Sequence, residues 1–228
     1  MLGKISCLIL DHDDTVVDST RVIHYPAYLE TMKLLRPHVV PESLDGWFLK
    51  NFHPGIMEYF IDELGFSETE LALEHSTWRS FVTNRRPMFF PGVVELLHAF
   101  KESGGKIVVA SHSEADMIEL DYHVETDCSL KPDLVFGWDV PDGKRKPSPW
   151  PVFQTIKELQ IKAEEVLIVD DLKPGVLMAR AAGVAIGGAG WGHDIPEIKT
   201  YMSEHCDYYF QSIEALRRFV FDPKGTCK

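Results

Sequence analysis

The sequence predicts an α/β fold, in which a doubly wound parallel sheet carries an inserted α-helical domain. Three short apolar runs, residues 8–10, 108–110 and 166–169, each stop abruptly at a polar side chain. Runs of this kind are typical of buried parallel strands. The polar residues that follow them are Asp11, Ser111 and Asp170. Because open sheets bind ligands beyond the carboxyl ends of their strands, we expect these side chains to converge on one crevice.

The second observation is a change to helical periodicity after the first strand. Ile56, Phe60 and Leu64 repeat every four residues, so they share one helical face. Helix-breaking residues divide this stretch into about four short helices: Pro37, Pro41, Pro54 and Gly65. We therefore expect a helical insert at residues 18–89, with residues 1–17 and 90–228 forming the sheet domain.

From residue 90 onward, strand-like and helical patterns alternate. The predicted strands cover residues 107–110, 134–136, 166–169, 184–186 and 208–210. The predicted helices cover residues 93–103, 149–159 and 174–182, and a further helix begins after Ser113. Strands that are separated by helices predict a parallel sheet with helices on both faces.

The composition limits the classes of function. The chain has 228 residues, of which 45% are hydrophobic and 25% charged, as is typical of a globular protein. Its formal charge of -12 argues against nucleic acid binding, which requires an accumulated basic surface. A small anionic substrate is compatible with this charge when a divalent cation lies between the carboxylates and a phosphate.

The cysteines and the apolar segments bear on location. Cys7, Cys128, Cys206 and Cys227 show no metal-binding spacing, so we expect reduced, buried thiols. The apolar stretch before Asp11 is too short for a signal core, and no apolar window approaches a membrane span. We therefore expect a cytoplasmic protein with no membrane partner.

Two acids directly follow the first strand. Asp11 and Asp13 are two residues apart, so they point to the same side if the strand geometry continues, while His12 points away. Two carboxylates this close require a cation, or separate roles as acid and base. The alternative is a loop in which aspartate caps the next helix. Because acidic or hydroxyl side chains end two other strands in the same way, the functional interpretation is favoured.

With these motifs the chain resembles the haloacid dehalogenase superfamily, and in particular its phosphoglycolate phosphatase and beta-phosphoglucomutase members. Residues 11–19 resemble the first motif of that superfamily, Ser111 the second, and Lys146 with Pro147 the third. Asp170 and Asp171, followed by residues 179–183, resemble the fourth. The resemblance covers nearly the whole length and implies a Rossmann-like core with a helical cap at residues 18–89.

The resemblance implies a role for each acid. Asp11 would be the nucleophile that forms an aspartyl phosphate. Asp13 would be the general acid that protonates the leaving oxygen, and then the base that activates water. Mg²⁺ would be held by Asp11, Asp170, Asp171 and the backbone carbonyl of Asp13.

The resemblance also implies a phosphate-binding set. Ser111 would hydrogen-bond a phosphate oxygen, together with the backbone N–H of His112 at a helix start. Lys146 would supply a positive charge to the phosphoryl group and the nucleophile. Each has a simpler alternative: Ser111 as a helix cap, residues 144–146 as a solvated loop, and Asp170 as a cap of the next turn.

Three positions depart from the pattern of the superfamily. Asp14 stands where glycine is usual, so the turn is made by a residue that only tolerates left-handed backbone. Gly175 stands where another form of the fourth motif has an acid, so the number of metal ligands depends on Asp170. His112 stands where asparagine is frequent.

Within the resemblance, Asp13 favours phosphate-ester chemistry, because cleavage of carbon–halogen or carbon–phosphorus bonds needs no acid there. The leading hypothesis is a Mg²⁺-dependent phosphomonoester hydrolase that acts on a small phosphorylated metabolite. Two alternatives stay open: a sugar-phosphate mutase of the beta-phosphoglucomutase type, and a non-catalytic protein that binds metal or a phosphometabolite. Candidate substrate contacts in the cap, for which a solvated helix face or packing within the cap is the alternative, are Arg21, His24, Arg36, Arg79, Arg85, Arg86, Trp47, Phe48, Phe52 and Trp78.

Overall fold

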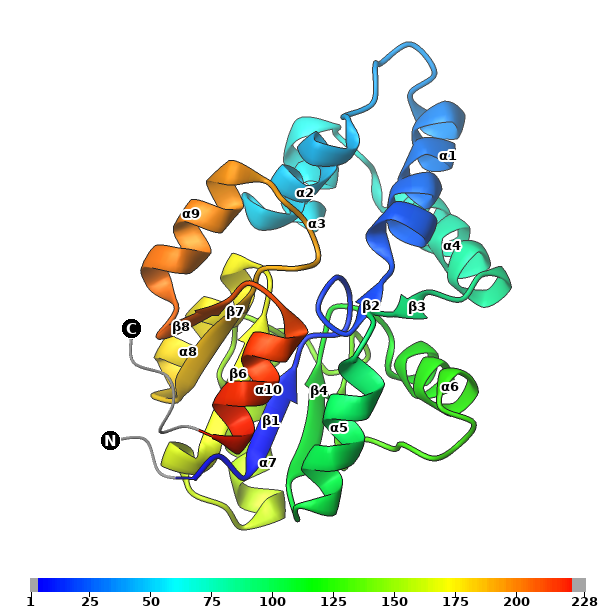
Figure 1. Ribbon diagram of the computed structural model, residues 1–228. Coiled ribbons are helices and arrows are strands. Elements are labelled where there is room, and N and C mark those ends of the chain that lie inside the picture. Colours follow the sequence, from blue (N-terminus) through cyan, green and yellow to red (C-terminus); the bar gives the residue numbers. More distant parts are fainter. Residues whose placement is uncertain (1–3, 223–228) are drawn as a thin grey trace. The chain divides into compact units, whose positions relative to one another are not determined.

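The computed structural model describes residues 4–222 of the chain (Figure 1). Its centre is a six-stranded sheet with the order β5-β4-β1-β6-β7-β8, in which all neighbouring strands are parallel. The strands are β1 (Cys7–Leu10), β4 (Lys106–Ala110), β5 (Leu134–Phe136), β6 (Val166–Asp170), β7 (Ala185–Ala189) and β8 (Tyr208–Phe210). From β1 the chain adds β4 and β5 on one side, and then β6, β7 and β8 on the other. The predicted doubly wound parallel sheet is confirmed, with its switch point at β1.

The register of the three central strands brings their carboxyl ends to one level. Leu10, the last residue of β1, pairs with Val109 of β4 and with Val169 of β6. Every residue of β1 is buried, because the strand lies in the middle of the sheet. Asp11 and Asp170 are the next residues on their strands, so the register alone brings two acids together at this edge of the sheet.

Helices cover both faces of the sheet. α5 (Val93–Glu102) and α10 (Ile213–Phe221) pack together on one face (Figure 1). α7 (Trp150–Leu159) and α8 (Lys173–Ala182) lie on the other. Along β1, Leu8 and Leu10 join the core beneath α5 and α10, as the alternation of side chains along a strand requires.

Several observed elements differ from the sequence prediction, among them one strand of the sheet and two helices. β7 runs to Ala189 rather than ending at residue 186, since it continues through Gly187 and Gly188, which have low strand propensity. The other two are helices that the prediction lacks, α9 (Pro196–His205) and α10. The sequence did contain a helical pattern at α10, because Leu216 and Val220 are apolar and four residues apart. Both side chains are buried.

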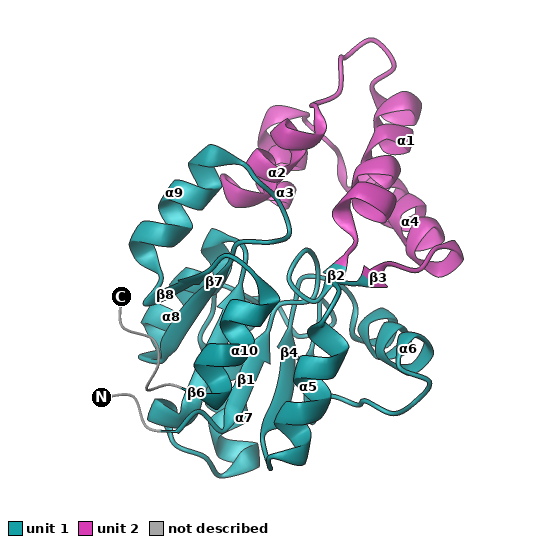
Figure 2. Ribbon diagram, viewed as in Figure 1, with its two compact units in different colours: residues 1–17, 89–228 teal, residues 18–88 magenta. Residues whose placement is uncertain are grey.

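The helices between residues 18 and 88 form a second compact unit (Figure 2). They are α1 (Tyr25–Leu35), preceded by the π-helical turn η1 (Thr20–His24), α2 (Leu44–Phe52), α3 (Ile56–Glu58), which continues as the π-helical η2 (Tyr59–Glu63), and α4 (Glu68–Asn84). The predicted breaks at Pro37, Pro41, Pro54 and Gly65 all fall between these helical stretches. Trp47, Phe48 and Phe52 are buried, and Trp47 stacks on Tyr28 with the ring centroids 4.3 Å apart.

The remaining described residues, up to Val17 and from Phe89 onward, form the sheet unit (Figure 2). The two segments at which the chain passes between the units, β2 (Val17–Asp18) and β3 (Met88–Phe89), pair as a two-stranded sheet. Within the sheet unit, α6 (Ala115–Glu125) follows β4, and the short 3-10 turn η3 (Ala163–Glu165) precedes β6.

The cysteines only partly follow the prediction. Cys7 is buried and Cys206 half-buried, and both are free thiols. Cys128 is also free, but it is exposed, because it lies in the irregular segment after α6. Cys227 lies outside the described residues. In the part of the chain that the structure describes, no helix is long and apolar enough to span a membrane.

The packing of α5 against the sheet yields a stability prediction. Leu96 on α5 is 1% exposed, so truncation to alanine leaves a cavity in the main core. We expect Leu96→Ala to lower the free energy of unfolding by about 2–5 kcal/mol. Leu177→Ala, at a 42% exposed position of α8, should change it by no more than about 0.5 kcal/mol. Urea unfolding of both variants measures the difference, and equal losses would contradict the assignment of the core.

Candidate active site

The chain reverses direction directly after β1. The backbone N–H of Asp11 donates to the carbonyl of Val169 on β6 (2.9 Å), and that of His12 donates to Asp11 Oδ1 (2.8 Å). The turn is closed by hydrogen bonds from the Asp14 N–H to Val17 O and from the Val16 N–H to His12 O. Asp14 has φ 55°, so the left-handed position where glycine is usual is indeed held by an aspartate. We call residues 11–17 the catalytic turn.

His12 points away from the two acids that flank it. Its Nε2 lies 3.1 Å from Asp121 Oδ2 on α6, and both side chains are buried. Asp13 instead turns toward the end of β4, where its Oδ2 accepts hydrogen bonds from Ser113 Oγ (2.6 Å) and Ser111 Oγ (3.3 Å). The carboxylate of Asp13 is thus held by two hydroxyl groups.

Lys146 reaches into the site rather than lying in a solvated loop. Its Nζ is 2.8 Å from Asp11 Oδ1 and 2.8 Å from Asp170 Oδ2, and only 4% of its side chain is exposed. Burial alone would lower the pKa of Lys146, but the two carboxylates more than offset this and raise it above its usual value. The side chain is therefore a firmly charged ammonium between two strand ends.

Asp170 makes the capping interaction that was one of its two predicted roles, and it also pairs with Lys146. One oxygen, Oδ1, accepts from the backbone N–H of Leu172 (2.9 Å) and so caps the following turn, while Oδ2 pairs with Lys146. Gly175 lies directly against this side chain, since a Cβ there would sit 2.3 Å from Asp170 Cγ. The space that a downstream acid would need is thus filled by Asp170 itself.

Asp11, Asp170 and Asp171 form a buried acidic cluster. One oxygen from each lies within 4.8 Å of the others. Burial raises the pKa of Asp170 and of Asp171 above the usual range, and the charge of Asp11 adds to both shifts, although Lys146 opposes them. Asp171 Oδ2 is buried without a hydrogen-bond partner. This donor set fits a hard divalent cation, whereas the carboxylate of Asp13 is not part of the cluster.

Ser111 and His112 lie before α6 rather than at its start. The helix begins at Ala115, so the helix predicted after Ser113 is confirmed. The Ser113 carbonyl accepts a hydrogen bond from the Trp138 N–H of the next loop (2.8 Å). The exposed His112 ring donates from Nε2 to the carbonyl of Lys146 (3.0 Å), so its side chain supports the segment that carries the lysine.

Several candidates in the helical unit have partners within that unit. Arg36 pairs with Glu70 and donates to the carbonyl of Leu64. Arg85 donates to the carbonyl of Val22. These two arginines stabilise helix connections, and the structure provides no separate evidence that they hold a substrate.

Two functional positions lie outside the sequence prediction. Ser113 contacts Asp13. The sequence feature that could have indicated this role is a second hydroxyl side chain two residues after Ser111. His193 lies 3.4 Å from Asp171 Oδ2 through its Nε2, and it belongs to a loop with no periodic pattern. Its position could only be found from the fold.

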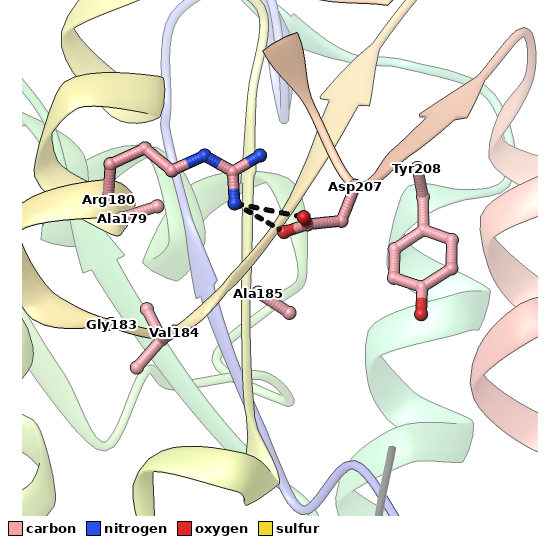
Figure 3. A pocket seen from close by; sticks show the side chains of 7 residues that line it. All are labelled: Ala179, Arg180, Gly183, Val184, Ala185, Asp207 and Tyr208. Carbon is pink, nitrogen blue, oxygen red and sulfur yellow. Dashed lines mark hydrogen bonds and ion pairs between the residues drawn. The ribbon is translucent and has the colours of Figure 1, made fainter. Parts of the chain in front are cut away.

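A separate depression lies at the opposite end of the strands (Figure 3). Its volume is about 450 Å³, and it is lined near the starts of β7 and β8 by Ala185 and Tyr208. Arg180 and Asp207 face each other there at 2.9 Å and neutralise each other's charge. None of the predicted site residues lines it.

Comparison with known proteins places the chain in a family. The family model of haloacid dehalogenase-like hydrolases matches residues 5–183. A phosphoglycolate phosphatase from Aquifex aeolicus (strain VF5) is 24% identical over 188 residues, which cover 82% of this chain and 85% of that protein. A haloacid dehalogenase-like family hydrolase from Streptococcus pneumoniae has a TM-score of 0.73 at 20% identity, covering 95% of this chain and 99% of that one. CbbY from Rhodobacter sphaeroides, solved as a mutant in complex with xylulose-(1,5)bisphosphate, has a TM-score of 0.68 at 16% identity, with 91% and 94% covered.

Carboxylates, a hydroxyl group and a buried lysine lie together at the carboxyl ends of the parallel strands. This arrangement is typical of enzymes that act on anionic substrates through acidic side chains. The chain belongs to the haloacid dehalogenase-like hydrolase family. The predicted class of enzyme, a phosphatase of this superfamily, is confirmed.

The acidic cluster predicts how stability depends on pH in metal-free protein. Because the pKa of Asp171 is raised on folding, its contribution to stability is greatest below its unfolded pKa and is lost as the pH rises through the folded pKa. Asparagine does not ionise. We therefore expect Asp171→Asn to melt a few degrees higher than the native chain near neutral pH in EDTA, with the gap closing toward pH 4. Thermal melts across this range test it, and a lower melting temperature of the variant at neutral pH would contradict it.

Proposed function

We propose that the protein is a Mg²⁺-dependent phosphomonoester hydrolase that acts through an aspartyl phosphate on Asp11. The observation that carries this proposal is the charge of the site. Three clustered, buried carboxylates share one buried ammonium, which pairs with Asp11 and Asp170, and this leaves an excess of two negative charges when all are ionised. Buried charge of this size is costly unless it is compensated, and a divalent cation supplies the matching charge.

Mg²⁺ is the cation we propose, because all the donors are hard oxygens. Asp11, Asp170 and Asp171 would hold it with their carboxylates, together with the backbone carbonyl of Asp13. The buried Asp171 Oδ2, which lacks a hydrogen-bond partner, supports this assignment. Bound there, the cation screens the repulsion between an anionic nucleophile and an anionic phosphate, and offsets charge in the transition state.

The chemical steps use two of the three acids of the catalytic turn, Asp11 and Asp13. Asp11 attacks phosphorus, and the bond from phosphorus to the leaving oxygen breaks. Asp13 donates its proton to that oxygen, and then takes a proton from the water that attacks the aspartyl phosphate. Release of inorganic phosphate returns Asp11 to its free form. Ser113, at 2.6 Å from Asp13, holds the acid in a defined rotamer during these transfers.

Two further groups recognise the phosphoryl group. Lys146 already contacts Asp11, so a phosphoryl group on that carboxylate would lie beside the ammonium. Ser111 and the backbone N–H of His112 would donate to the remaining oxygens. The contact from His112 to the Lys146 carbonyl joins the two binding segments.

We propose that the helical unit is a cap that selects small phosphorylated metabolites. The phosphoglycolate phosphatase of Aquifex aeolicus and the CbbY complex with xylulose-(1,5)bisphosphate support a substrate of this size. The acids are also those of a sugar-phosphate mutase, which stays as the second candidate. The cytoplasmic location stays a prediction.

The direct test is phosphate release from a generic aryl phosphate, with Mg²⁺ and with EDTA. We expect turnover by the native chain only with Mg²⁺, and a loss of at least about a thousand-fold in Asp11→Asn, because the nucleophile is gone. Asp142→Asn is the matched control, since that side chain is 92% exposed and should leave turnover unchanged.

The outcomes separate the candidates. Full activity of Asp11→Asn would contradict the proposed nucleophile. Absence of turnover in the folded, Mg²⁺-binding native chain would favour a mutase that needs its own sugar phosphate, or a non-catalytic binder.

A further inference from the structure

The loop between β7 and α9 packs against the catalytic turn. Its first residue, Gly190, is anchored to the neighbouring strand, because its N–H donates to the carbonyl of Phe210 in β8 (2.9 Å). The residues that follow are Trp191, Gly192 and His193. None of the motifs found in the sequence includes these three positions, so their place beside the site comes from the fold alone.

Trp191 is tied to the backbone of the catalytic turn. Its indole Nε1 donates to the carbonyl of Thr15 (2.9 Å), and its ring packs on the edge of the main core. The hydroxyl of Thr15 in turn lies 3.4 Å from Asp171 Oδ1. The loop is therefore connected through Thr15 to the acidic cluster.

Gly192 allows the two backbones to touch. A Cβ at this position would lie only 2.0 Å from the carbonyl oxygen of Asp14, so no other residue fits without displacement of the backbone. Asp14 is also the residue of the catalytic turn that has a left-handed φ. The contact between Gly192 and Asp14 thus fixes the separation between the loop and the catalytic turn.

His193 is the residue that this anchored loop presents to the acidic cluster. Its Nε2 lies 3.4 Å from Asp171 Oδ2, and its side chain is 5% exposed against 1% for Asp171. That oxygen of Asp171 has no hydrogen-bond partner in the described structure. The imidazole therefore lies beside a buried carboxylate oxygen that accepts no hydrogen bond from the described residues.

We propose that His193 is a positioning residue that orients the Asp171 carboxylate for the divalent cation. The inference rests on the metal site of the proposed function and adds to it a residue outside the four motifs. Groups that contact metal-bound carboxylates fix the carboxylate orientation and raise metal affinity, and their loss costs about 10- to 100-fold in affinity or activity. Trp191 and Gly192 contribute by holding the loop backbone, so the imidazole does not need to be ordered when the metal binds.

The test is calorimetric titration of MgCl₂ into the metal-free full-length protein, without substrate. We expect His193→Ala to weaken Mg²⁺ binding about 10- to 100-fold. His193→Asn should recover part of this loss, because its amide offers an N–H group that can face the same carboxylate. His205→Ala on the exposed end of α9 is the matched control and should bind as the native chain does. Melting temperatures of the metal-free variants establish that each is folded.

The outcomes distinguish this inference from the proposed function. Native affinity in a folded His193→Ala variant would overturn the role of His193 and leave the metal site in place. If the native chain and Asp171→Asn both fail to bind Mg²⁺, the metal site of the proposed function fails as well. A loss of affinity in His193→Ala with no recovery in His193→Asn would also overturn the orienting role, because a donor at that position would then make no difference.

Discussion

The structure depends on the burial of three carboxylates around the ammonium of Lys146. Asp11 and Asp170 each lie 2.8 Å from its Nζ, and Asp171 completes the acidic cluster. One ammonium balances only one of the three charges. The cluster therefore carries an uncompensated negative charge. Burial raises the pKa of Asp170 and of Asp171, and the charge of Asp11 adds to both shifts. The divalent cation of the proposed function would supply the charge that this site lacks.

The fold supplies the proximity that this cluster requires. Parallel pairing of β1 with β4 and β6 brings the strand ends to one level, so the acids approach each other as a consequence of register. Loops that lie later in the chain then orient these acids. Asp13 is held by Ser113 after β4, and Asp171 is bordered by His193 after β7. Each of these acids is thus positioned by a strand end and by a neighbouring loop, as expected where a rigid scaffold fixes the geometry of a site.

The sequence was sufficient for the parts of the structure that depend on local pattern. Apolar runs predicted the central strands, and the polar residue after each run predicted the convergence of Asp11, Ser111 and Asp170. The sequence did not predict the contacts that irregular loops make. Nothing local distinguishes His193 from a surface histidine, because its contact with Asp171 is created by the packing of one loop on another. The hydrogen bond from the Trp138 N–H to the Ser113 carbonyl is another contact of this kind.

Detection of the aspartyl phosphate tests the central claim most directly. Native enzyme and Asp11→Asn would be mixed with an aryl phosphate and Mg²⁺, quenched in acid within one turnover, digested, and examined by mass spectrometry. The account predicts one added phosphoryl group on the peptide that contains Asp11 in the native enzyme, and none in Asp11→Asn. Phosphate release from the native enzyme without any phosphorylated peptide, or with the phosphoryl group on another residue, would contradict it.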